Sequence, residues 1–208
     1  MLYESERKDL CTVVKTMFDR FETNAAGGNV SVRINDDHII MTPTLMSQQK
    51  LCDLTPYDIL VVTMDEEIVE GDGKLTREIN MHMACYKQNK KIGCVIHAHP
   101  RDSLFFATLG IELPNLTEAT QKLGKIPTLD YRPATTVELA DLVREHIKSL
   151  GDDVVPKACL LNSHGILITD KTLHKAYDML ERIEYNAYIA EKALIFDKLG
   201  IVPLHKEC

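Results

Sequence analysis

The sequence of 208 residues has no long hydrophobic run and no excess of basic charge. None of its apolar stretches approaches the roughly twenty residues that cross a bilayer, and the charged N-terminus lacks the apolar core of a signal peptide. The formal net charge of −7 argues against a nucleic-acid partner, because phosphate backbones require a basic surface. We therefore expect neither a membrane protein nor a nucleic-acid-binding protein.

Several other signatures are missing. The six cysteines are scattered, with no CxxC pair and no dense framework, and this spacing favours reduced thiols and a cytoplasmic location. The glycine pair Gly27-Gly28 is followed by neither Gly-Lys-Ser/Thr nor a helix, so it is not a P-loop or a dinucleotide fingerprint. Without repeats, low-complexity tracts or linkers, residues 1–208 are expected to form a single domain.

The spacing of apolar residues predicts helices alternating with strands. One face of a helix recurs at every third or fourth residue, whereas a strand alternates at every second residue. Helices are expected at 4–21, 76–89, 101–109, 136–150 and 173–199, with Thr76 as an N-cap. Strands are expected at 29–34, 38–42, 59–64, 68–69, 92–100, 158–161 and 166–169, while 113–131 should contain a loop, a short helix and a strand. This order predicts an α/β domain with helices covering a mixed sheet.

Two histidines two residues apart, His97 and His99, lie at the end of the apolar segment 92–100. Successive side chains of a strand alternate sides, so both imidazoles should face the same way. Imidazole pairs suit a borderline metal such as zinc, which needs a third ligand and an open position if it is catalytic. The alternative is a pair of histidines that only contact water or carboxylates.

His164 is the best candidate for the third imidazole. It stands in a Ser-His-Gly turn between two apolar strands, where glycine permits close backbone approach. A lone histidine in such a turn is otherwise an ordinary polar residue. The other histidines are expected on the surfaces of helices, turns or the tail: His38, His82, His146, His174 and His205.

Two further features are ambiguous on the residues alone. Glu78 is expected in a first helical turn, where the helix dipole favours a negative charge, but it could also be a fourth metal ligand or a general base. The Gly27-Gly28 loop could let backbone N–H groups approach an anion, or it could be an ordinary turn.

Taken together, these segments resemble the class II aldolase/adducin family. The matching motifs are Gly28-Asn29-Val30-Ser31-Val32-Arg33, Thr42-Pro43-Thr44, Glu78 with Met81-His82, His97-Ala98-His99-Pro100 and Ser163-His164-Gly165. The resemblance implies a three-layer αβα fold with a central, largely antiparallel sheet, assembled as a homotetramer with active sites between subunits.

The resemblance also implies roles for individual residues. His97, His99 and His164 would bind Zn²⁺ or another divalent metal, and Glu78 would bind the resting metal and then swing away to move a proton. Gly28, Asn29 and Thr44 would bind the phosphate of a sugar phosphate. A metal that chelates the hydroxy-ketone oxygens would stabilise the enediolate formed on C–C cleavage.

The sequence departs from the family pattern in three segments. Leu45 replaces a glycine and is expected to hinder backbone approach to a phosphate. Thr76 and Arg77 replace two serines; Arg77 could clamp a phosphate or carboxylate, or it could remain in solvent. Glu118 stands near the family's tyrosine acid and matches a glutamate of related dehydratases, so it is either a proton donor or an exposed helix-start residue.

These observations favour a zinc-dependent aldolase that cleaves a ketose 1-phosphate to dihydroxyacetone phosphate and a short aldehyde. Glu78 favours this reaction over the 4-epimerase branch, which resembles the family but has aspartate there. The alternatives are a metal-dependent decarboxylase of a phosphorylated sugar acid, because some such relatives have a basic residue where Arg77 stands, and a non-catalytic adducin-like module. The intact histidine set argues against the module.

Overall fold

The computed structural model describes residues 1–201, whose strands form one sheet in the order β4-β3-β2-β1-β5-β8-β7-β6. The strands are β1 (Asn29–Arg33), β2 (His38–Met41), β3 (Leu60–Thr63), β4 (Ile68–Glu70), β5 (Cys94–Ala98), β6 (Thr128–Leu129), β7 (Lys157–Leu161) and β8 (Gly165–Asp170). Within this sheet β6 and β7 are parallel, and every other pair is antiparallel. The prediction of a largely antiparallel central sheet is confirmed.

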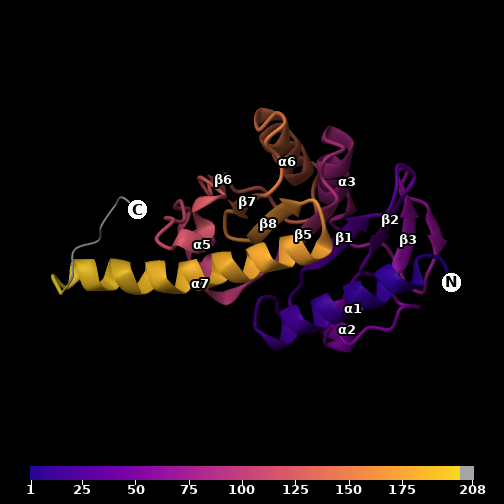
Figure 1. Ribbon diagram of the computed structural model, residues 1–208, viewed down its shortest axis with the longest axis horizontal. Helices are drawn as coiled ribbons and strands as arrows, with labels where there is room; N and C mark the ends of the chain where they lie inside the picture. Colours follow the sequence, from indigo (N-terminus) through magenta and orange to yellow (C-terminus); the bar gives the residue numbers. More distant parts are fainter. Residues whose placement is uncertain (202–208) are drawn as a thin grey trace.

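Helices cover both faces of the sheet (Figure 1). They are α1 (Glu4–Asp19), α2 (Met46–Lys50), α3 (Ile79–Gln88), α4 (Arg101–Leu109), α5 (Glu118–Gln121), α6 (Val137–Ser149) and α7 (Leu173–Lys198). The apolar side chains of α3 and α6 pack in one core, and those of α1, α4 and α7 pack in the other. The three-layer αβα architecture is therefore confirmed.

The strand β5 shows how sequence alternation separates the two cores. Cys94, Ile96 and Ala98 belong to the core under α1, α4 and α7, whereas Val95 belongs to the core under α3 and α6. His97 has the same parity as Val95 and is fully buried. The strand thus delivers an imidazole to the face that α3 and α6 cover.

A half-buried carboxylate on α7 holds the corner at which β5 turns into α4. Glu184 accepts hydrogen bonds from the backbone N–H groups of Asp102 at 2.5 Å and Ser103 at 2.9 Å. These are among the first N–H groups of α4, which have no partner within the helix itself. The contact holds the chain immediately after His99 in place.

The structure corrects several expected boundaries. The helix expected at 76–89 begins at Ile79, so Thr76 is not its N-cap and Glu78 takes that position. The reason is a turn over 76–79, in which Ile79 N donates to Thr76 O and the Thr76 hydroxyl accepts from Glu78 N at 3.3 Å. The first helix ends at Asp19 rather than residue 21, and the short α2 was not predicted.

Other expectations concern the surface and the thiols. Five cysteines of the described chain are free: Cys11, Cys52, Cys85, Cys94 and Cys159. Cys208 and His205 lie outside the described residues. Among residues 1–201, none of the helices combines the length and the apolar character needed to cross a membrane.

Candidate metal centre and adjoining cavity

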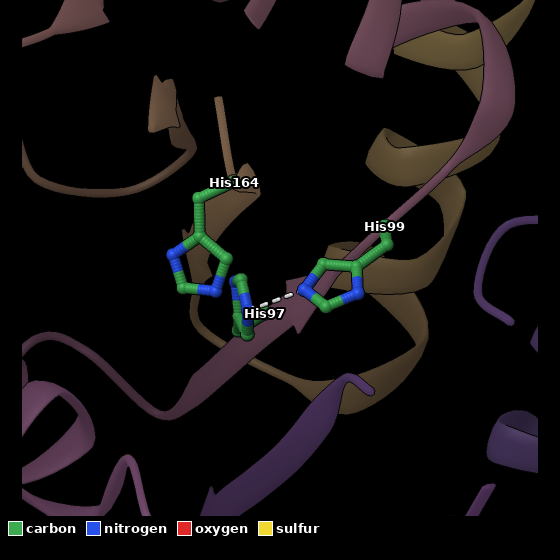
Figure 2. A group of neighbouring side chains, drawn as sticks. All are labelled: His97, His99 and His164. Atoms are coloured by element: carbon green, nitrogen blue, oxygen red, sulfur yellow. Dashed lines mark hydrogen bonds between the residues drawn. The ribbon is translucent and has the colours of Figure 1, made fainter. Parts of the chain in front are cut away.

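Three imidazoles from two neighbouring strands meet at one edge of the sheet. His97 lies on β5 and His99 directly follows it, while His164 lies in the turn between β7 and β8. Since β5 pairs with β8, with Ala98 opposite Ile166, the turn bearing His164 is brought beside the end of β5. Figure 2 shows the three rings pointing toward one another. The structure brings these three sequence-predicted residues together.

The ring nitrogens are oriented for metal binding. His97 Nδ1 lies 3.0 Å from the carbonyl oxygen of Ile166 and donates a hydrogen bond to it, so Nε2 is the nitrogen that faces the other candidate ligands. That Nε2 lies 3.1 Å from His99 Nε2. One ligand atom from each of the three histidines lies within 4.8 Å of the others. Such a set matches the three-histidine arrangement of catalytic zinc sites.

Two glycines make room for the imidazoles. A Cβ atom at Gly165 would lie 2.4 Å from the carbonyl oxygen of Ala98 and 2.7 Å from His99 Cδ2. A Cβ atom at Gly27 would lie 2.8 Å from His99 Cε1. Both distances are too short for any side chain, so each glycine is required for close approach rather than for a bend.

Glu78 completes the cluster. Its Oε2 lies 3.2 Å from His97 Nε2, and its Oε1 lies 3.3 Å from His164 Nε2. Burial alone would raise the pKa of this carboxyl group, but the attraction of His97 and a hydrogen bond from Asn29 outweigh it and lower the pKa to about 2. Glu78 is therefore an ionised carboxylate in a buried place.

The donor set fits a divalent metal ion. Burial, followed by the charges of neighbouring histidines, lowers the pKa of His99 to about 3 and that of His164 to about 4, so both imidazoles are neutral at physiological pH. Neutral imidazoles and an ionised carboxylate are the forms that bind zinc. The buried atom Glu78 Oε1 also lacks a hydrogen-bond donor within the described residues.

A cavity of about 380 Å³ opens beside this cluster. Residues of the predicted phosphate site line it together with two of the histidines: Gly28, Asn29, Thr44, Thr76, Arg77, His99 and His164. Leu45 also lines it, with its side chain 40% exposed and its backbone at φ 59°. The guanidinium of Arg77 is exposed at the cavity and has no ion pair within the described residues.

One predicted site residue lies elsewhere. Glu118 begins α5, is exposed, and does not line the cavity of its own chain. The segment before it is held by the buried Asn186 of α7, whose Oδ1 accepts from Leu116 N and Thr117 N. Glu118 thus occupies a fixed place on the outer surface of this chain.

The expectation that His82 lies on a surface was wrong. His82 is fully buried, and its ring bridges Asn29 and Ser31. The signal was available, since His82 follows Glu78 by four positions and therefore shares its helix face. Sequence reasoning also missed residues that line the cavity from a loop and from the short α2: Met46, Ser47, Gln48, Ala134 and Thr135.

Known proteins resemble this chain in both sequence and structure. The model of the class II aldolase and adducin N-terminal domain matches residues 8–190. The chain belongs to this family. The match includes all four candidate ligands and the whole lining of the cavity.

Individual members of the class II aldolase and adducin family show the range of the resemblance. An L-fuculose phosphate aldolase of Methanococcus vannielii is 33% identical over 192 residues, which cover 92% of this chain and 98% of that protein. A 3-oxo-tetronate 4-phosphate decarboxylase of Escherichia coli is 26% identical over 194 residues, covering 88% and 85%. A solved L-fuculose 1-phosphate aldolase superposes with a TM-score of 0.82 at 26% identity, covering 98% of this chain and 91% of that one.

Proposed function

We propose that this protein is a metal-dependent aldolase that cleaves a ketose 1-phosphate to dihydroxyacetone phosphate and a short aldehyde. The observation that carries the proposal is the convergence of three imidazoles and the Glu78 carboxylate at the wall of a polar cavity. Relatives with the names L-fuculose phosphate aldolase support the same reaction class. The proposed substrate is therefore a phosphorylated ketose of a size similar to L-fuculose 1-phosphate.

His97, His99 and His164 would hold the ion, which we propose to be Zn²⁺. When bound, such an ion acts as a Lewis acid toward the hydroxy-ketone oxygens of the substrate. Glu78 is ionised and lies at the same cavity wall, so it can take a proton from the substrate and return one at the carbon. The buried surroundings of Glu78 keep bulk water from competing for that proton.

The phosphate would bind among the other polar groups that line the cavity. The loop of Gly27 and Gly28 presents backbone close to the cavity, and the hydroxyl groups of Thr44 and Thr76 are further donors. The side-chain amide of Asn29 already binds Glu78, so one of its two N–H bonds is taken. Arg77 adds the positive charge that the dianion requires.

Glu118 enters the proposal only through assembly. It is exposed and remote from its own cavity, so as the proton donor it would act in the site of an adjacent subunit of a homotetramer. Subunit mixing tests this step, with Glu78→Gln and Glu118→Gln chains that are each expected to be inactive alone. Recovery of activity after the two variants are refolded together supports a site shared between subunits. A mixture that stays inactive argues against it.

A second reaction is favoured by one specific observation. The free guanidinium of Arg77 at the cavity could bind a substrate carboxylate, as decarboxylation of a phosphorylated sugar acid would require. A third possibility is an adducin-like module without catalytic activity. The buried and ionised Glu78 argues against it, because such a module needs no carboxylate at a metal centre.

A product screen distinguishes these functions. The purified protein is incubated with L-fuculose 1-phosphate, other ketose 1-phosphates and 3-oxo-tetronate 4-phosphate. Release of dihydroxyacetone phosphate supports the aldolase, and release of carbon dioxide from the sugar acid supports the decarboxylase. Arg77→Met should weaken the binding of a ketose 1-phosphate through its phosphate, but it should abolish turnover of the sugar acid, whose carboxylate would lose its partner. A folded, metal-loaded protein that turns over none of these compounds contradicts both enzyme proposals.

A further inference from the structure

A continuous chain of buried hydrogen bonds leads away from Glu78 into the protein interior. Asn29 Nδ2 lies 3.0 Å from Glu78 Oε2, and Asn29 Oδ1 lies 2.5 Å from His82 Nε2. On the other side of the ring, His82 Nδ1 lies 2.6 Å from Ser31 Oγ, which lies 2.9 Å from the hydroxyl of Tyr86. Each of the five side chains is at most 8% exposed.

This series of hydrogen bonds follows from the spacing of side chains on β1 and α3. Asn29 and Ser31 are two residues apart on β1 and therefore face the same side of the sheet. Glu78, His82 and Tyr86 are spaced by four on α3 and its N-cap, so they form a row on one helix face. The two rows interdigitate, and each polar group reaches the next one along the opposite row.

The donor and the acceptor of each hydrogen bond can be assigned in order, starting from Glu78. The Asn29 amide nitrogen faces Glu78 Oε2 and donates to it, and the amide oxygen therefore faces His82 Nε2. His82 Nε2 must then bear a proton. In a neutral ring this leaves Nδ1 as an acceptor, so Ser31 donates to His82 and accepts from Tyr86. Burial, followed by the charge of His97, lowers the pKa of His82 to about 3, in agreement with a neutral ring.

We propose that His82 and Ser31 are positioning residues that lock the Asn29 amide as a fixed N–H donor to the Glu78 carboxylate. Removal of the Ser31 hydroxyl would leave His82 free to move its proton to Nδ1. Asn29 could then rotate its amide and present oxygen to the carboxylate, which would displace Glu78 by repulsion between two acceptors. The catalytic consequence rests on the proposed function, whereas the tautomer and the orientation of the amide do not.

Neutron diffraction from a crystal of the purified protein tests the geometry directly. The proposal predicts deuterium on His82 Nε2 and none on Nδ1, with the Asn29 amide nitrogen toward Glu78. Deuterium on Nδ1, or on both nitrogens, at neutral pH overturns the proposal. This result is independent of any substrate, so a protein that fails the product screen still decides it.

Steady-state kinetics test the consequence. Ser31→Ala should lower kcat roughly 10- to 100-fold, the usual cost of losing an outer partner of a metal site, with KM and metal content unchanged. Ser103→Ala, at an equally buried serine on α4, is the matched control and should keep the parent kcat. His82→Gln retains an N–H toward Asn29 and should be more active than His82→Leu. Parent-like kcat in a folded Ser31→Ala protein overturns the positioning role.

Discussion

Glu78 Oε2 lies 3.2 Å from His97 Nε2, although one residue precedes helix α3 and the other lies on strand β5. The contact exists because the turn over 76–79 leaves Glu78 as the residue before α3, with its carboxylate toward His97 and His164. The same placement leaves Glu78 beside the cavity. A single carboxylate can therefore serve both the metal centre and the substrate.

Replacing Glu78 by glutamine should lower kcat by about 100- to 10,000-fold, the range expected for a positioned acid or base. Metal content should persist, because the three imidazoles remain. The assay is triose phosphate release, with Glu138→Gln at the exposed start of α6 as the control. A fully active Glu78→Gln protein would remove this carboxylate from the mechanism.

Replacing Gly165 by alanine should reduce metal affinity. The new methyl group would collide with the carbonyl oxygen of Ala98 and with the His99 ring, so the ligands would have to move apart. Gly151→Ala is the matched control: its methyl group has open space, and its φ of 59° costs only about 1 kcal/mol of stability. Metal titration by calorimetry checks both variants, and equal affinities would refute the steric argument.

Replacing Leu45 by glycine should lower KM for a phosphorylated substrate. Leu45 adopts a left-handed backbone at φ 59°, a conformation that glycine takes without strain, and its side chain occupies part of the cavity wall. Relief of about 1 kcal/mol of strain should offset the larger entropy of glycine in the unfolded chain, so stability should change little. A raised KM in a stable variant would show that the leucine side chain contributes to binding.

Replacing Glu22 by glutamine should flatten the pH dependence of stability. Burial, then repulsion from Glu181, raises the pKa of Glu22 to about 8. Between pH 4.5 and 8 the folded state binds more protons than the unfolded state, so the free energy of unfolding falls as pH rises, by at most about 1.4 kcal/mol per pH unit. Denaturant melts at pH 5 and pH 9 should show that Glu22→Gln stabilises mainly at pH 9. An equal effect at both pH values would contradict the raised pKa.

The sequence predicted most of the helices and strands because their apolar periodicity is regular, whereas the largely antiparallel sheet followed from the family resemblance. The sequence also predicted that the three histidines lie close together. The alternation of side chains along β5 places His97 and His99 on one side, and the turn before β8 carries His164. The start of α3 was misplaced because the apolar pattern does not reveal the turn over 76–79, which is held by hydrogen bonds to Thr76. The expected metal, cytoplasmic location and homotetramer stay predictions.

The buried role of His82 could not be read from its own residue type. Histidine is intermediate in burial, and only the interdigitation of β1 with α3 shows that Asn29 and Ser31 enclose it. The cavity wall formed by Ser47 and Thr135 likewise depends on loop conformations that local patterns do not specify. The burial of His82 and the shape of the cavity wall therefore depend on tertiary contacts rather than on local secondary-structure propensity.

The most direct measurement is the metal content of the purified protein, by elemental analysis of the parent and of His99→Ala. His174→Ala, at an exposed histidine on α7, is the matched control. We predict about one divalent ion per chain in the parent and the control, and loss of that ion in His99→Ala through removal of one of three imidazole ligands. A folded parent protein that holds no ion and cannot be reconstituted with zinc or another divalent metal would contradict the proposed metal centre.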